Sequence, residues 1–124
     1  PGRGGIDVRM KKLRNHLIGV DQGEVSIVSD YDDGGEMWTG TGQRERRRRV
    51  RFAESFRTAP AVQCTVAMWD VAGGTNQRGD VAAESVTGEG FELVFRTWSD
   101  TRIARLRVRW MAIGELAHAD DWSV

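Results

Sequence analysis

From about residue 23 onward, apolar and polar residues alternate with a period of two, and Gly, Asn, Asp and Pro separate the alternating segments. Successive side chains of a β-strand point to opposite faces, so this alternation is typical of strands with one buried face. Apolar residues at helical spacing are nearly absent. The pattern therefore predicts an all-β protein.

Six segments carry the alternation, and turn-forming stretches such as 29–36 (SDYDDGGE) and 70–80 (DVAGGTNQRGD) separate them. The predicted strands are 24–29, 46–52, 62–68, 81–86, 91–98 and 104–112. Because each has one apolar face, the expected fold is a six-stranded antiparallel β-sandwich, two sheets packed face to face. The side chains expected in its core are Val62, Cys64, Val66, Phe91, Leu93, Phe95, Leu106, Val108 and Trp110.

The length of 124 residues is that of one domain, which we place at residues 20–116. Residues 1–19 are expected to be an N-terminal extension, in part vector-derived or flexible, and residues 117–124 a C-terminal tail. The apolar stretch LIGV at 17–20 is shorter than the core of a signal peptide, and no apolar run is long enough to span a bilayer. The expected location is the cytoplasm or an exported or phage-like particle.

Charge and candidate catalytic residues exclude several classes of function. The 18 basic and 18 acidic residues give no net charge, and the one cysteine, Cys64, excludes a disulfide framework. His16 and His118 lie in the least patterned parts of the chain, so no nucleophile has an evident base, and we expect a non-enzymatic protein without a cofactor. The carboxylates of 30–33 (DYDD) lack the spacing of a calcium loop and are assigned to a turn, so no metal is expected.

Arginine is concentrated in two rows, in RERRRRVR at 44–51 and at the alternate positions 105, 107 and 109. Such rows are able to follow a phosphate backbone, so nucleic-acid binding is one interpretation. The alternative is an outer face on which the arginines pair across strands with Glu45, Glu54, Glu84 and Glu92, or lie at a protein–protein interface. Since no aromatic platform separates the basic residues, we favour the second interpretation.

Several short motifs occur in an order that resembles the H-type lectin domain, the family of the snail agglutinins and of the discoidin C-terminal domain. They are Phe52, Phe56 and Pro60 in F-x(3)-F-x(3)-P, Asn76-x-Arg78, Thr87 to Phe91 in T-x-x-GF, Thr97 to Thr101 in TW-x-x-T, and Trp110. The resemblance extends over roughly residues 20–116. It implies a six-stranded β-sandwich, in agreement with the strand pattern.

The resemblance also implies a homotrimer that binds galactose or N-acetylgalactosamine in clefts between protomers, with a role in cell adhesion. Arg78 and Trp98 match sugar contacts of the family, and the proposed cleft includes Asn76, Ser99, Asp100 and the 39–43 loop of a neighbour. Three positions depart from the family: Ser99 replaces a histidine, Ala104 an aromatic residue of the neighbouring protomer, and Thr41 an acidic residue. Val94 and Trp69, apolar residues expected on polar faces, support the trimer.

Two further functions stay open. One is a trimeric structural or assembly domain, for example of a phage-like particle or fibre, in which Trp98 packs at a protomer boundary and no sugar binds. The other is nucleic-acid binding through the arginine-rich strand, which the neutral net charge disfavours. We expect glycans as partners, and neither a membrane nor nucleic acid.

Overall fold

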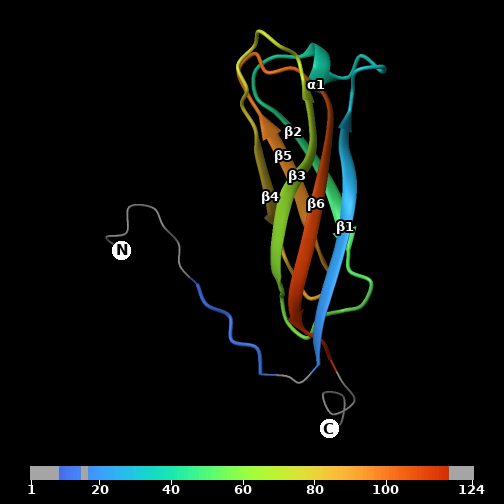
Figure 1. Cartoon of the computed structure of the whole chain (residues 1–124), viewed down its shortest axis with the longest axis vertical. Helices are drawn as coiled ribbons and strands as arrows, with labels where there is room; N and C mark the ends of the chain where they lie inside the picture. The colour runs from blue at the N-terminus through green and yellow to red at the C-terminus, as the bar shows by residue number, and fades with distance from the viewer. Residues whose placement is uncertain (1–8, 15–16, 118–124) are drawn as a thin grey trace, which may run out of the picture.

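The computed structural model describes residues 9–14 and 17–117, and the predicted six strands are all present (Figure 1). They are β1 (Ile18–Ser29), β2 (Arg44–Arg51), β3 (Ala61–Val71), β4 (Asp80–Glu84), β5 (Gly90–Thr97) and β6 (Ile103–Glu115). One short helix that the sequence pattern did not predict, α1 (Glu36–Thr39), follows the first strand. His16, His118 and most of the predicted N-terminal and C-terminal extensions lie outside the described residues.

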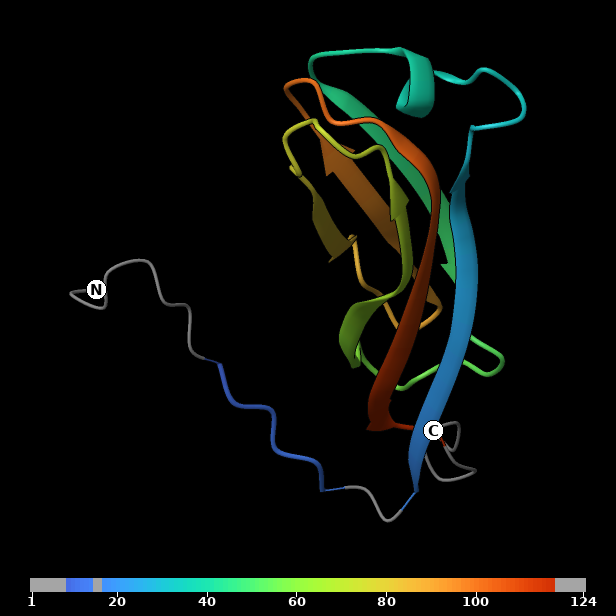
Figure 2. The same cartoon turned by 45° about the horizontal axis from the view of Figure 1, so that its top comes forward.

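The strands form two antiparallel sheets of three strands each, ordered β1-β6-β3 and β2-β5-β4. The sheets pack face to face, and the loops on either side of α1 lie at the same end as the β5–β6 reversal and the β3–β4 loop (Figures 1 and 2). The prediction of an all-β antiparallel sandwich is therefore confirmed. Loops from distant parts of the sequence are brought together at one end.

Aromatic rings fill the core at the opposite end. Phe52 contacts Phe56, Phe91 and Trp110 at centroid distances of 5.0, 5.8 and 5.9 Å, and the first of these contacts is edge to face. Gly23 pairs with Trp110 across β1 and β6 and makes room for the indole, since a Cβ at Gly23 would lie 2.7 Å from its Nε1. Glycine is required at this position because the indole packs directly against the backbone.

The predicted core set is largely confirmed. The aromatic and aliphatic members on β5 and β6 are buried, and Val62 and Cys64 are half-buried against them. The prediction for Val66 is wrong, because this residue is 48% exposed beside a bulge between Val66 and Met68. A bulge changes the direction in which the neighbouring side chains point. The alternation of apolar and polar residues does not reveal where a bulge occurs.

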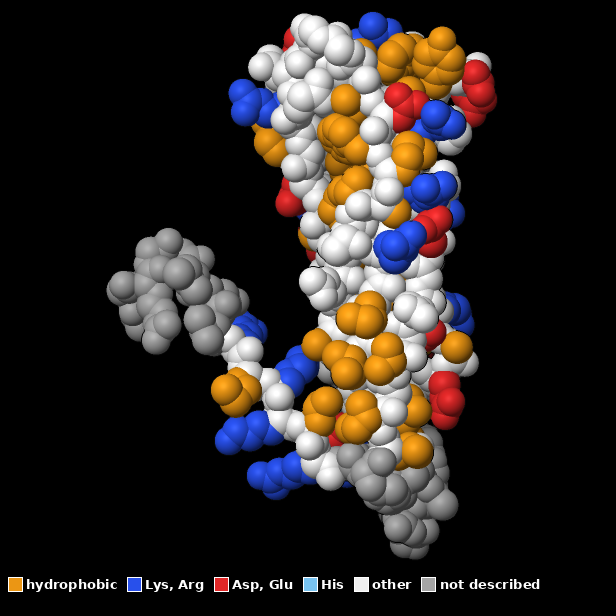
Figure 3. Space-filling view, in the orientation of Figure 1, with side chains coloured by type: hydrophobic (Ala, Val, Ile, Leu, Met, Phe, Trp, Pro, Cys, Tyr) orange, Lys and Arg blue, Asp and Glu red, His pale blue; other side chains and the backbone are white. Residues whose placement is uncertain are grey.

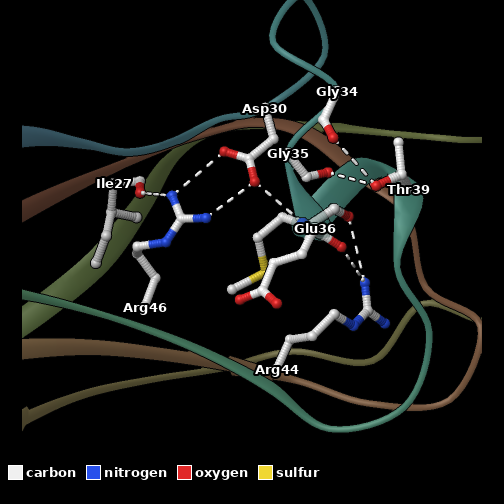
Figure 4. A network of polar contacts seen from close by, with 9 residues as sticks. Ile27, Asp30, Gly34, Gly35, Glu36, Thr39, Arg44 and Arg46 are labelled. Carbon is white, nitrogen blue, oxygen red and sulfur yellow. Dashed lines mark hydrogen bonds and ion pairs between the residues drawn. The ribbon is translucent and has the colours of Figure 1, made fainter.

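The arginine run of β2 faces both ways. Arg44 and Arg46 are buried or half-buried, while Arg47, Arg49 and Arg51 are exposed. Arg46 donates to the Ile27 carbonyl of β1 at 3.3 Å and binds Asp30 through both carboxylate oxygens at 3.2 and 2.9 Å (Figure 4). Arg46 thus joins the two sheets along their shared edge, and the inward arginines of the run are engaged within the chain.

Candidate functional site

Two loops far apart in the sequence are tied together at the loop end of the sandwich. The backbone and side-chain amides of Asn76 donate to the Asp100 carboxylate at 3.0 and 2.9 Å. The hydroxyl of Thr101 then donates to the Asn76 carbonyl at 2.6 Å and accepts from the Arg78 N–H at 3.0 Å. The 75–80 loop, which carries Arg78, is therefore fixed to the reversal that carries Trp98.

The Asp100 carboxylate is stabilised in its ionised form by this contact. Hydrogen bonds from the side chain and then the backbone of Asn76 hold the pKa of Asp100 below its ordinary value. A carboxylate that accepts such bonds favours its charged form. Asp100 and Asn76 were predicted as sugar contacts, and the structure uses both to join the loops.

A third loop, residues 39–43, packs against the same reversal. The Gly42 N–H donates to the Ser99 carbonyl at 2.8 Å, and the buried Arg44 donates from Nη2 to that carbonyl at 3.3 Å. Arg44 also donates to the Gly42 carbonyl. In α1 it donates to the carbonyls of Met37 and Glu36 (Figure 4). The chain's own 39–43 loop is therefore held against the reversal that carries Trp98.

Ser99 adopts a backbone conformation that is uncommon for a residue with a side chain. Its φ is +63°, in the left-handed region. The bonds that its carbonyl accepts from Gly42 and Arg44 hold this conformation. Its hydroxyl lies 3.5 Å from both the Asn76 amide and the Asp100 carboxylate, at the limit of hydrogen bonding. Ser99 therefore shapes the reversal that presents Trp98.

Trp98 borders a hollow of about 660 Å³ beside sheet β2-β5-β4. Trp98 is 41% exposed, although large apolar side chains are usually covered. Gln43, Asp80 and the Glu45–Arg96 ion pair at 2.8 Å also line the hollow. An aromatic face beside amide, carboxylate and guanidinium groups fits a ligand that is apolar on one side and rich in hydroxyls on the other.

The predicted pairing of outer-face arginines with glutamates is found beside this hollow. Glu45 and Glu84 each contact both Arg47 and Arg96, at 2.8 Å in three contacts and 3.2 Å in the fourth. These hydrogen bonds and charges lower the pKa of both glutamates. Val94 of β5 lies opposite Arg47 of β2 in the sheet, and its side chain is completely buried. The expectation that Val94 is an exposed apolar residue in support of a trimer is therefore wrong.

Two predicted site residues keep their functional groups free. Within the described residues, the Arg78 guanidinium makes no hydrogen bond or ion pair, and the Thr41 hydroxyl makes none. Both residues are exposed, on the loops joined to the reversal. Arg78 does not line the hollow itself, but Gly79 and Asp80 directly after it do. A free cation on a loop fixed to the exposed indole is available to a ligand.

The strand residues Glu45 and Arg96, which line the hollow around Trp98, were not predicted as site residues, whereas Gln43 and Asp80 lie in loops that were expected to form the cleft. Asp80 and Glu45 are both register partners of Arg96, on either side of β5. This neighbourhood depends on strand order, which the period of two does not reveal. The one available signal was the position of Asp80, two residues after Arg78 at the start of a strand.

Neither a cluster of metal-ligating side chains nor a membrane-spanning helix is found in residues 9–14 and 17–117. No three His, Cys, Asp or Glu side chains in these ranges come together as metal ligands. Asp30, from the acidic stretch, instead accepts the Met37 N–H at 3.0 Å and so builds the turn into α1. No helix there has the length and apolar character that a membrane span requires.

Comparison with known proteins gives one consistent family. The model of the H-type lectin domain matches residues 47–113. The chain is 50% identical over 107 residues to "ATP synthase subunits region ORF 7" of Fuscovulum blasticum, covering 86% of this chain and 93% of that protein. It is 36% identical over 75 residues to discoidin-1 of Dictyostelium discoideum, covering 60% of this chain and 30% of that protein.

Solved structures agree with the sequence comparison. Discoidin II of Dictyostelium discoideum superposes with a TM-score of 0.68 at 28% identity, over 81% of this chain and 38% of that one. The tailspike protein gp49 of Pseudomonas phage LKA1 shares the fold, with a TM-score of 0.52 at 16% identity, over 81% of this chain and 15% of that one. The chain thus spans about a third of the length of the discoidins. It belongs to the H-type lectin domain family.

Proposed function

We propose that this domain binds galactose- or N-acetylgalactosamine-type glycans at the loop end, with Trp98 as the stacking ring and Arg78 as the orienting cation. The observation that carries the proposal is that the Trp98 indole is exposed and that the Arg78 guanidinium has no partner among the described residues. Both are held on loops that hydrogen bonds fix together. A preorganised site of this kind loses little entropy when a ligand binds.

Galactose-type sugars suit an indole because their axial hydroxyl leaves one ring face with a continuous patch of C–H groups. That face stacks on Trp98, while Arg78 donates charged hydrogen bonds to the hydroxyls at the ring edge. Such a bond contributes about 1.5 to 3 kcal/mol, and the stacking about 1 kcal/mol beyond the buried area. Ser99 and Thr41 add weaker hydroxyl contacts, and Asn76 and Asp100 act by fixing the loops.

We further propose that the domain forms a homotrimer with its sugar sites between protomers. Support comes from the outer face of sheet β1-β6-β3, where Val20, Ile113 and Ala61 are in register across the three strands. Val20 is 58% and Ile113 38% exposed, and apolar side chains gather over this part of the sheet (Figure 3). An apolar row of this kind on a sheet is typical of a surface that another chain covers.

A trimeric assembly domain without sugar binding is the second candidate, because the same apolar row supports it. The two candidates differ in what covers Trp98, which is a sugar in the first and a neighbouring protomer in the second. Nucleic-acid binding has less support, since Arg44 and Arg46 face inward and Arg47 is paired with glutamates.

A screen of immobilised glycans tests the proposal against the assembly alternative. We expect retention on galactose- or N-acetylgalactosamine-terminated glycans and none on DNA or RNA. If no glycan retains the protein and light scattering reports a trimer, the result would instead favour the assembly domain. A salt-sensitive complex with nucleic acid would favour the arginine-rich strand.

A further inference from the structure

Positive charge is concentrated in a short segment that precedes the sandwich. Four of the six residues 9–14 (RMKKLR) are Lys or Arg and none is Asp or Glu, whereas residues 17–117 hold 13 basic and 15 acidic residues. A cationic arm, residues 9–14, therefore precedes a body whose own charges nearly balance. The charge of the whole chain hides this separation.

The cationic arm lies at the end of the sandwich opposite the loop end (Figures 1 and 2). Nζ of Lys11 donates to the Ala59 carbonyl at 3.0 Å. Residues 11–13 form one wall of a hollow of about 150 Å³, and residues 58–60 and 113–115 form the other. The arm thus borders the body at the end opposite the reversal that carries Trp98.

The cations of the arm are available to a partner. Lys11, Lys12 and Arg14 are exposed, and Lys12 and Arg14 make no hydrogen bond or ion pair within the described part of the chain. The bond of Lys11 goes to a neutral carbonyl and leaves its charge uncompensated. Glu115 is the one acidic residue that lines the neighbouring hollow, and it contacts Arg57 at 3.8 Å. The arm therefore attracts anions.

Exposed apolar side chains accompany these cations. Met10 is 82% and Leu13 42% exposed, and an apolar side chain stands among the basic side chains of the arm (Figure 3). Leu17 and Ile18, which follow the arm, are 38% and 40% exposed. A dissolved polyanion offers nothing to such apolar groups. The surface of an anionic bilayer binds both kinds of side chain, because the cations meet the headgroups while the apolar groups enter the acyl boundary.

We propose that the cationic arm binds the surface of a membrane that contains anionic lipid, with its Lys and Arg side chains at the headgroups and Met10 and Leu13 in the acyl boundary. Binding at a bilayer surface requires no membrane-spanning helix. The proposal revises the expectation from the sequence that no membrane is a partner. Because the arm and the loops lie at opposite ends, Trp98 and Arg78 would face away from the bilayer.

The charge of the arm sets the size of the effect. Each Lys or Arg close to an anionic bilayer strengthens binding about fivefold. Four cations therefore give a preference of roughly several hundredfold for anionic over neutral vesicles. Salt should weaken this preference, because it screens the attraction between the exposed cations and the headgroups.

Sedimentation with lipid vesicles tests the proposal. We expect the wild-type protein to bind vesicles made of equal parts of phosphatidylcholine and phosphatidylglycerol, and not vesicles of phosphatidylcholine alone. Lys11→Glu with Lys12→Glu should weaken binding to the mixed vesicles at least about 25-fold. Arg49→Glu with Arg51→Glu makes the same change in net charge on the exposed face of β2, and should bind like wild type.

A third variant tests the apolar contribution. Met10→Ser with Leu13→Ser keeps every charge of the arm, and it should weaken vesicle binding at least about tenfold, because burial of these side chains is lost. Since all the substituted residues are exposed, the melting temperature should not change in any of the three variants. Vesicle binding unchanged by the serine substitutions would contradict insertion of the arm.

Two further results would overturn the proposal. Equal loss of vesicle binding in the two charge-reversal variants would show that net charge, and not the arm, decides binding. Failure of the wild-type protein to bind the mixed vesicles would also overturn it, and if the protein then bound a DNA duplex through Lys11 and Lys12, the arm would be a nucleic-acid contact. None of these measurements involves a sugar, so the proposed function and this proposal can fail independently.

Discussion

Asn76 donates both its backbone and its side-chain amide to the Asp100 carboxylate, at 3.0 and 2.9 Å, and so joins the loop of Arg78 to the reversal of Trp98. The sequence positions of these residues suggest direct ligand contacts. We propose that, through these bonds, they act as positioning residues that hold the loop of Arg78 against the reversal of Trp98. This distinction can be measured.

Asp100→Ala should therefore weaken galactose binding several-fold while leaving the melting temperature nearly unchanged, because the bonds lie at the surface. Asp100→Asn removes the charge but keeps an oxygen acceptor, so it should recover part of the affinity. Isothermal titration and thermal melts of both variants check this. If Asp100→Ala binds like wild type, the loop contact has no role in positioning.

Acid should loosen the turn into α1 through Asp30. Burial by itself raises the pKa of Asp30, but hydrogen bonds from Arg46 and from the Met37 N–H outweigh it, so the net pKa is lowered. A lowered pKa in the folded state means that Asp30 contributes stability above its unfolded pKa of about 3.9 and loses it as the pH falls through the folded value.

Urea denaturation of wild type and Asp30→Asn at neutral pH and near pH 3 measures this contribution. At neutral pH the variant should be less stable by about 1.5 to 3 kcal/mol, the range for hydrogen bonds to a charged group. The difference should shrink at the acid pH, because Asp30 of the unfolded wild type then takes up a proton. A difference independent of pH would show that the charge of Asp30 is not involved.

Trp110 should be among the residues most sensitive to truncation. It is 6% exposed, and its indole packs against Phe52 and Phe91 at centroid distances of 5.9 and 5.5 Å. Trp110→Ala should lower the free energy of unfolding by about 3 to 5 kcal/mol. Arg51→Ala, on the exposed face of β2, serves as a control with little effect. An unchanged melting temperature for Trp110→Ala would contradict the assigned core.

The proposed trimer depends on the apolar row of sheet β1-β6-β3. Val20→Asp places a charge where the next chain would pack, and light scattering should then report the mass of a monomer. Arg49→Asp, at an exposed position of the other sheet, should leave the trimer intact. If the wild-type protein is a monomer at micromolar concentration, the result would contradict both the proposed trimer and the proposed site between protomers.

Periodicity was sufficient for the strands and most of the core, because each strand buries one face. Periodicity gave the wrong burial where something other than the alternation decides which way a side chain points. Val66 is exposed next to a bulge, and Val94 is buried although its neighbours on the outer face are charged. In the arginine run, the alternation set by Val50 and Phe52 placed Arg47, Arg49 and Arg51 on the outer face, and all three are exposed.

The candidate site was predictable only in part. The family motifs contain Trp98 and Arg78, and the structure leaves both available to a ligand. The roles of Asn76 and Asp100 depend on loop contacts that no local pattern encodes.

The central claim is that Trp98 and Arg78 bind a galactose-type sugar. Isothermal titration of wild type, Trp98→Ala, Arg78→Ala and the control Arg51→Ala with N-acetylgalactosamine tests it most directly. Binding by wild type and Arg51→Ala, with at least about tenfold weaker binding by the other two at unchanged oligomeric mass, is the predicted result. Full binding by both site variants, or their dissociation into monomers, would contradict the claim.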